Sequence, residues 1–339
     1  MLKHILCLSC VVMLLLTARS AAGAQSGKLV AKFFDVGQAD ASLITCPDGQ
    51  HKLLIDAADN RYPASQEKFR NAMTQAFSGG NRRIEVVVSS HPHADHISSM
   101  NWVLTNFTVG TYVDNGQKYD STTFGTLETT RRKLVKNGQL KYIDGRANSF
   151  NTVNFCPLVE VQLLSAWAVQ EMSDPNDRSV AVRIKHGERT FLFLGDIEGE
   201  AEHVMLSAFT PEQHALLNVD VLKVGHHGSD TSSGAELINA VSPQAAVVSC
   251  GDKDVGTNKG YKHPRLSTIR NYDHWFKNLG TNHPSLLSQA PSGNLWAYDA
   301  LKKKWVQEKR PAGVWFTPHD GAITIRSDGQ TLEVERENP

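Results

Sequence analysis

Hydrophobic and polar positions alternate along residues 29–334 in a pattern that predicts strands and helices in repeated succession. Short apolar runs bounded by Gly, Pro or Asp predict strands at 29–36, 41–45, 52–56, 84–88, 159–164, 179–184, 190–194, 219–224, 245–249, 321–325 and 331–334. Apolar residues three or four positions apart predict helices at 65–77, 97–107, 123–135, 198–209 and 265–279. One further helix is expected after 219–224, with Ser233 and Glu236 as its capping pair. This order predicts two sheets packed face to face with helices outside.

The N-terminal segment has a different pattern. A short basic start is followed by an apolar run over residues 5–16 and by small residues that end in Ala22-Gly23-Ala24. This is typical of a secretory signal peptide over residues 1–24, because the apolar run is too short to cross a bilayer. We therefore expect an exported protein, periplasmic or secreted, with no membrane span in the mature chain and with a single domain over 28–336.

Composition excludes several classes. With 40% hydrophobic residues, the 339-residue chain can form a sizeable core, which excludes a disordered or fibrous protein. Lys plus Arg equals Asp plus Glu at 35 each, and loss of residues 1–24 would leave a net charge of −2. No general attraction to nucleic acid is therefore expected, and the basic runs at 131–133 and 302–304 are interpreted as solvated surface. Three cysteines remain, Cys46, Cys156 and Cys250, so one disulfide can form, and which pair forms it stays open.

A histidine-rich loop carries the clearest chemical signal. The strand at 84–88 is followed by His91-Pro92-His93-Ala94-Asp95-His96. Imidazole and carboxylate groups bind Zn²⁺, and Mn²⁺ also accepts them. His91 and His93 can point one way while Asp95 and His96 point another, so the loop can serve two ions that share and activate a water molecule.

Further ligands must come from distant sequence, and three later strand ends supply them. Asp196 follows the strand at 190–194, and its two oxygens could bridge two ions. His226 and His227 lie between glycines after the strand at 219–224. They are candidates for a metal ligand or a catalytic acid. His263 precedes Pro264 at the start of the helix at 265–279, and it is a further ligand candidate.

These residues resemble those of the metallo-β-lactamase-fold superfamily and, more narrowly, its ComEC-like branch of competence proteins. The resemblance rests on the His-x-His-x-Asp-His loop, on the late Asp and His, and on the segments 34–41, 54–56, 176–180, 222–229 and 321–325. It implies an α/β fold, an αββα four-layer sandwich, with the site at the shared edge of the two sheets.

The resemblance also implies roles for individual residues. His91 and His93 would hold one ion, Asp95 and His96 the other, and Asp196 would bridge them. The last ligand would be His263 rather than His226, and His226 and His227 would act on the substrate. Asp95 would also accept a proton from the attacking water. Asp56, Asn176 and Ser179 would support the metal ligands from the outer shell, with Asp56 orienting the loop. Many relatives have a further histidine ligand in the region of residues 176–179, where this chain has none.

The sequence thus predicts an exported metal-dependent hydrolase with two divalent ions, zinc rather than manganese as the first expectation. Its substrate would contain a phosphodiester, as a small molecule, a headgroup or DNA, and no obligate protein partner is expected. Two alternatives stay open. One is hydrolysis of a lactam, lactone or thioester on the same fold, and the other is a non-catalytic exported metal-binding module.

Overall fold

The structure is a computed structural model that describes residues 27–147, 150–164, 172–279, 286, 289 and 291–338. The predicted signal peptide at 1–24 lies outside these residues. None of the helices in the described part of the chain combines the length and hydrophobicity that crossing a bilayer requires.

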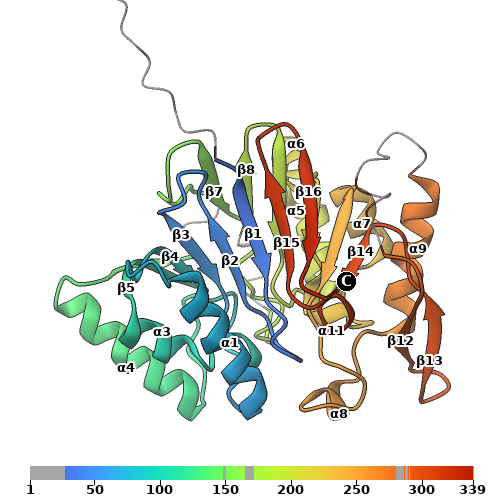
Figure 1. Ribbon diagram of the computed structural model, residues 1–339, viewed down its shortest axis with the longest axis horizontal. Coiled ribbons are helices and arrows are strands. Elements are labelled where there is room, and N and C mark those ends of the chain that lie inside the picture. Colours follow the sequence, from blue (N-terminus) through green and yellow to red (C-terminus); the bar gives the residue numbers. More distant parts are fainter. Residues whose placement is uncertain are drawn as a thin grey trace, which may run out of the picture.

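Within the described residues, the first sheet has eight strands in the order β16-β15-β1-β2-β3-β4-β5-β6 (Figure 1). Their bounds are β1 Leu29–Phe33, β2 Ser42–Thr45, β3 Lys52–Ile55, β4 Arg83–Val88, β5 Thr108–Asp114, β6 Lys141–Asp144, β15 Ile323–Ser327 and β16 Leu332–Arg336. Strands β3 to β6 run parallel to one another. Their carboxyl ends therefore meet at one edge of the sandwich.

The second sheet has six strands in the order β14-β11-β10-β9-β8-β7, and β12 pairs with β13 as a separate hairpin. The bounds are β7 Val159–Leu163, β8 Val182–His186, β9 Arg189–Phe193, β10 Val221–Lys223, β11 Ala245–Val248, β12 Asn294–Asp299, β13 Lys304–Lys309 and β14 Val314–Phe316. Strands β9, β10, β11 and β14 are parallel. This sheet therefore also gathers several carboxyl ends at one edge.

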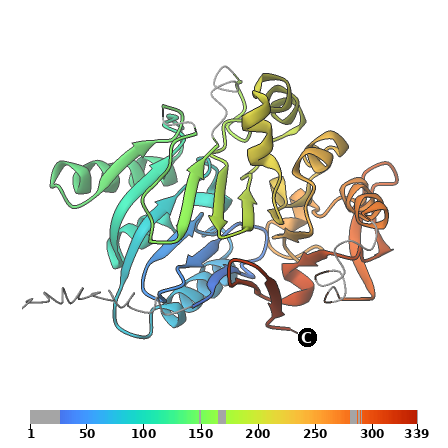
Figure 2. The same ribbon diagram turned by 90° about the horizontal axis from the view of Figure 1, so that it is seen from above.

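Three apolar layers hold the molecule together. A core between the two sheets contains Phe33, Phe193 and Trp315, and two outer cores lie between each sheet and its helices. Figures 1 and 2 show the helices on the two outer faces. They are α1 Pro63–Ala76, α2 Ala94–Ile97, α3 Met100–Asn106 and α4 Thr122–Lys136 on the first sheet, and α5 Gly199–Ala208, α6 Pro211–Leu217, α7 Ala235–Val241, α8 Asn258–Tyr261 and α9 Leu266–Asn278 with the second, while α11 Thr317–Asp320 follows β14. The predicted αββα sandwich is confirmed.

Two details of the predicted elements were wrong. The helix expected at 97–107 is shorter, because α2 ends at Ile97, Ser98 and Ser99 follow, and α3 begins at Met100. The expected capping pair of α7 does not form, because its N-cap is Gly234 and has no side-chain cap. Instead the Glu202 carboxylate, from α5, accepts hydrogen bonds from the backbone N–H groups of Ser233 at 2.5 Å and Gly234 at 2.9 Å. A carboxylate from another helix thus satisfies donors that a local side chain was expected to satisfy.

A disulfide joins Cys46, which follows β2, to Cys156, which precedes β7, with Cα atoms 6.4 Å apart. Because β2 is antiparallel to β3, Cys46 lies at the end of the sandwich opposite the carboxyl end of β3. Cys250 is a buried free thiol. The pairing that the sequence left open is therefore Cys46 with Cys156.

Candidate metal centre and its cleft

The predicted site residues gather where the carboxyl ends of the two sheets meet. Asp56 follows β3 and the His91–His96 loop follows β4, while Asp196 follows β9 and the histidine pair follows β10. Backbone hydrogen bonds fasten these loops, from Val180 N to Ser90 O at 2.9 Å and from His226 N to Gly195 O at 3.1 Å. A cleft of about 740 Å³ opens onto the cluster, lined by His93, Asp95, Asp196, His226 and His263 among others.

The His91–His96 loop places its side chains through a short helix. His93 is the N-cap of α2, so Asp95 and His96 lie in its first turn. Nε2 of His91 lies 3.1 Å from Nδ1 of His93. Two zinc ligands at 2.0–2.1 Å in a tetrahedron lie about 3.3 Å apart. This pair therefore has the spacing of two ligands of one ion.

Asp196 is the centre of the cluster. Its Oδ2 lies close to four imidazole nitrogens, Nε2 of His96 at 3.2 Å, of His227 at 3.6 Å, of His226 at 3.8 Å and of His91 at 3.9 Å. Gly195 places Asp196 by packing tightly, because its φ is 60° and an added Cβ would lie 2.7 Å from Ser179 Oγ. That same hydroxyl accepts a hydrogen bond from Asp196 N at 3.1 Å. Ser179, expected near the site, thus holds the turn rather than facing the cleft.

The hydrogen bonds at the far ring nitrogens define which nitrogens face the cluster. Nδ1 of His96 donates a hydrogen bond to Asp56 Oδ2 at 2.8 Å, and Nδ1 of His227 donates one to Ser249 O at 3.0 Å. In a neutral imidazole, a proton on Nδ1 leaves a lone pair on Nε2. In the neutral form of either ring the Nε2 lone pair therefore faces Asp196, and Asp56 is placed against His96 as an outer carboxylate is against a metal ligand.

The cluster contains buried polar atoms that nothing in the described chain satisfies. His96 Nε2, His227 Nε2 and Asp196 Oδ1 are buried without a hydrogen-bond partner. Such atoms are rare because each costs about 1–3 kcal/mol. Asp95 completes the arrangement, since its Oδ2 lies 3.6 Å from His227 Nε2. Two imidazoles and two carboxylates converging with free lone pairs fit a divalent cation such as Zn²⁺.

The electrostatics of the cluster also favour a cation. Burial opposes ionisation of Asp196, but the positive field of His96 and His227 outweighs it and holds the pKa of Asp196 well below its usual range. Burial likewise opposes charge on His227, but Asp196 and Asp40 outweigh it and raise the pKa of His227 to about 10. Without a metal ion, the carboxylates stabilise a proton on the neighbouring imidazoles. A bound cation would supply the positive charge in place of that proton.

Asp40 and Lys223 belong to the site although the sequence did not single them out. Both are buried, and Lys223 Nζ donates to Asp40 Oδ2 at 2.7 Å. Burial raises the pKa of Asp40, but Lys223 and His227 lower it more, to about 2. The other oxygen of Asp40 lies 3.5 Å from His227 Nδ1. Both lie in segments that carry the family resemblance, 34–41 and 222–229, but their pairing could not be predicted, because the two residues lie 183 positions apart.

His263 takes a place different from the predicted one. It lines the cleft, yet it is not among the histidines with a nitrogen within 4 Å of Asp196. Gln38 accepts from Gly251 N at 3.0 Å, so its amide NH₂ donates to His263 Nδ1 at 3.1 Å. An imidazole that accepts at Nδ1 carries its proton on Nε2. The structure therefore brings His227, rather than His263, to the carboxylates, and His263 offers a donor instead of a lone pair.

His226 faces the cleft beside the cluster. Its Nδ1 lies 2.9 Å from Glu198 Oε1, and Glu198 also accepts from Thr231 Oγ1 at 2.7 Å. The hydrogen bond from His226 holds the pKa of Glu198 below its usual value. Asn176 lines the same cleft and bonds to Glu198. The arrangement is a histidine–carboxylate pair that fixes the ring with Nε2 directed toward Asp196.

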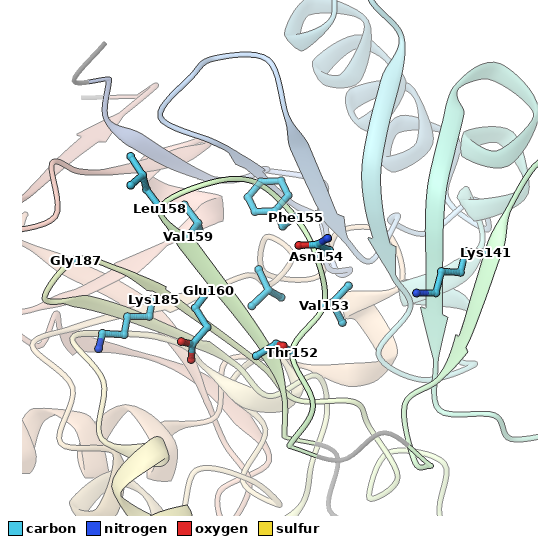
Figure 3. Close-up of a pocket in the computed structure, with 11 residues that line it drawn as sticks. Lys141, Thr152, Val153, Asn154, Phe155, Leu158, Val159, Glu160, Lys185 and Gly187 are labelled. Carbon is cyan, nitrogen blue, oxygen red and sulfur yellow. The ribbon is translucent and has the colours of Figure 1, made fainter. Parts of the chain in front are cut away.

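A second hollow of about 600 Å³ lies elsewhere, beside Phe155 (Figure 3). Lys141 reaches it from β6, whereas the other labelled residues come from the segment 152–160 and from β8 and its turn. Its lining contains no histidine or cysteine. It therefore lacks the convergent ligands of the first cleft.

Comparison with known proteins identifies the family of the chain. The sequence profile of the Metallo-beta-lactamase superfamily matches residues 34–252, more than half of the chain. The chain therefore belongs to this superfamily, whose fold includes metal-dependent hydrolases.

Within the superfamily the chain is similar to competence proteins. It is 25% identical over 248 residues to ComE operon protein 3 of Bacillus subtilis (strain 168), covering 70% of this chain and 29% of that protein. It is 35% identical over 91 residues to Competence protein ComA of Neisseria gonorrhoeae, covering 27% of this chain and 12% of that one. The predicted ComEC-like branch is confirmed. The chain spans less than a third of these relatives.

Among solved structures, the short form of human tRNase Z is similar at a TM-score of 0.40 and 13% identity, covering 66% of this chain and 93% of that one. This likeness concerns the fold alone.

Proposed function

We propose that this protein is an exported, metal-dependent phosphodiesterase. The observation that carries the proposal is the set of buried, unsatisfied ligand atoms of His96, His227 and Asp196 at the floor of an open cleft. Similarity to competence proteins supports a phosphodiester substrate. The Cys46–Cys156 disulfide supports export, since such bonds persist mainly in oxidising compartments.

Asp95, His96, Asp196 and His227 would hold one divalent ion, and His91, His93 and Asp196 would hold the other. Ions held by these residues would supply a water of lowered pKa and positive charge to polarise the attacked group. We assign the last ligand position to His227 in place of His263. Asp56 and the Ser249 carbonyl keep two of the ligand rings in place through their Nδ1 atoms.

The remaining residues of the cleft bind the substrate and move a proton. His226, whose Nδ1 is held by Glu198, would give a proton from Nε2 to the leaving oxygen when both of its ring nitrogens carry protons. His263 donates from Nε2 to a non-bridging oxygen of the phosphodiester, as donors aimed at developing charge do. Arg61 and Arg265 line the same cleft, where Arg61 pairs with Asp59 at 2.8 Å and Arg265 with Asp230 at 3.5 Å.

Purified protein, stripped with chelator and then supplied with Zn²⁺ or Mn²⁺, should hydrolyse bis-(p-nitrophenyl) phosphate. The same preparations are assayed on a chromogenic β-lactam, a lactone and a thioester, with a chelator control. Hydrolysis of those acyl compounds without phosphodiester turnover would contradict the proposal in favour of acyl hydrolysis. Tight binding of metal with no turnover of any substrate would contradict it in favour of a binding module.

A further inference from the structure

A buried ion pair joins the two sheets next to the candidate metal centre. Lys223 ends β10 of the second sheet, and Asp40 lies between β1 and β2 of the first sheet. Lys223 is 3% exposed and Asp40 is 4% exposed, and Lys223 Nζ donates to Asp40 Oδ2 at 2.7 Å. Neither residue is among those that line the cleft. Any influence of this pair on the reaction must therefore pass through the residues of the cluster.

The backbone around Asp40 is fixed on both sides. Asp40 N donates to Asp95 O at 3.1 Å, and Asp40 O accepts from Ala58 N at 2.9 Å. Lys223 Nζ also donates to Val224 O at 2.8 Å. A buried ion pair rarely stabilises a fold more than apolar residues of the same volume would. Stability alone therefore does not explain why a lysine and an aspartate lie here.

The second oxygen of Asp40 lies against the cluster. Asp40 Oδ1 is buried without a hydrogen-bond partner among the described residues, and it lies 3.5 Å from His227 Nδ1. A carboxylate oxygen of Asp40 also lies within 4.8 Å of ligand atoms of His96, Asp196 and His227. Asp40 is therefore a third carboxylate, besides Asp95 and Asp196, within reach of an ion at the cluster.

A third ionised carboxylate would change how the centre holds a divalent ion. Asp95 and Asp196, when ionised, carry two negative charges, which balance one divalent cation. Another carboxylate on the same ion would occupy a position that catalytic metal sites keep open for water or substrate. Its negative charge would also lower the power of the ion to polarise a substrate. The ammonium group of Lys223 opposes both effects, because it neutralises Asp40 and binds one of its oxygens.

We propose that Lys223 is a positioning residue that withholds the carboxylate of Asp40 from the metal centre. With Lys223 in place, the ion is left to Asp95 and Asp196 and stays reactive. Without Lys223, the free carboxylate of Asp40 would attract the ion, which would be held more tightly and would act less on a substrate. The inference rests on the proposed function, and it assigns a role to a residue that touches neither substrate nor ion.

Three variants test this role by the sign of their effects on Zn²⁺ affinity, measured by competition with a chromophoric chelator at constant pH. Lys223→Met should bind Zn²⁺ at least about 10-fold more tightly, and Asp40→Asn, which leaves an unpaired ammonium group, at least about 10-fold more weakly. The double variant D40N/K223M should return to within about 3-fold of the wild type. Two divalent ions bring four positive charges and displace at most the protons of His96 and His227, so loading makes the cluster more positive in each variant.

Turnover and a control variant separate this role from a structural one. At saturating Zn²⁺, Lys223→Met should hydrolyse bis-(p-nitrophenyl) phosphate about 10-fold more slowly, and D40N/K223M should regain part of that loss. Arg310→Met is the matched control, because it breaks a buried pair with Asp320, 2.5 Å long and outside the cleft lining. It should lower stability without changing Zn²⁺ affinity.

The inference is overturned by weaker or unchanged Zn²⁺ binding in Lys223→Met, by unchanged binding in Asp40→Asn, or by full turnover in Lys223→Met. A structural role alone would weaken binding in both single variants. Opposite affinity shifts in the two variants, from a wild type that turns over no phosphodiester, would contradict the proposed function and still support the role of Lys223 toward the ion.

Discussion

The two ends of the sandwich join the same two sheets by different means. At the disulfide end, Cys46 and Cys156 link the sheets covalently among apolar residues such as Val153 and Phe155. At the cleft end, the link consists of hydrogen bonds between loops and of buried carboxylates that face imidazoles. The first end therefore stabilises the fold on its own. The second end is left with buried charge that a bound cation would compensate.

Replacing Asp196 should produce the largest effect, because it removes the carboxylate shared by the whole cluster. We expect Asp196→Ala to lower phosphodiester turnover by about 10³-fold or more, the scale of losing metal charge stabilisation. Its circular dichroism should stay close to that of the wild type, while its free energy of unfolding in chelator should fall, because His96 and His227 lose the carboxylate that stabilises their positive charge. Asp230→Ala, a carboxylate of the same cleft outside the cluster, is the matched control. Equal losses in the two variants would contradict the central position of Asp196.

Replacing His226 should produce a somewhat smaller effect that depends on the leaving group. Without the proton held on Nε2, His226→Ala should turn over an alkyl phosphodiester about 10²–10³-fold more slowly. A p-nitrophenyl ester, whose leaving group needs no proton, should lose much less. Glu198→Gln should follow the same pattern more weakly. If both substrates slow equally, His226 does not act as the proton donor.

Opening the disulfide should affect stability without affecting chemistry. The double variant C46A/C156A should lose about 2–5 kcal/mol in free energy of unfolding. Its turnover should be unchanged wherever it is folded, because the bond lies at the far end of the sandwich. Denaturant titration with and without reductant provides the control, since reductant should destabilise the wild type and leave the variant unaffected. Loss of turnover in folded variant would show that the two ends are coupled.

The smallest effect is expected from Glu202, a buried carboxylate outside the cluster. Burial raises its pKa to about 7, against 4.5 for an exposed glutamate. Folded protein therefore retains a proton that unfolded protein has released between pH 4.5 and 7, so stability falls as pH rises through this window. Glu202→Gln mimics the protonated form. Relative to this variant, the wild type should lose up to about 3 kcal/mol of its free energy of unfolding between pH 4.5 and pH 8.

Denaturant titrations of the two proteins in chelator measure this difference. Glu200→Gln, on the exposed side of the same helix, should leave the pH dependence of the wild type unchanged. A constant difference between wild type and Glu202→Gln across this range would contradict the raised pKa.

Much of the fold could be predicted because its strands are short apolar runs with clear turn residues. Strand β5 was missed, since Gly110 interrupts its apolar pattern. The β12–β13 hairpin does alternate, with Leu295 and Ala297 inward and Trp296 and Tyr298 outward. That alternation was overlooked, so neither β12 nor β13 was predicted.

The candidate site could be predicted as a set of residues, and the role of each histidine could not. Three late histidines were available as ligands, and their hydrogen-bond partners separate them. Ser249 O fixes His227 toward the carboxylates, whereas Gln38 turns a protonated nitrogen of His263 into the cleft. Such partners lie 22 and 225 positions away along the chain, and only the packing of the two sheets brings them together.

The most direct measurement is anomalous X-ray diffraction at the zinc edge from crystals grown with Zn²⁺. The account predicts a peak about 2.0–2.2 Å from His96 Nε2, His227 Nε2 and oxygens of Asp95 and Asp196. A second peak should lie against His91 Nε2 and His93 Nδ1. The absence of a peak at the cluster, or an ion held by His263 with His227 left out, would contradict it.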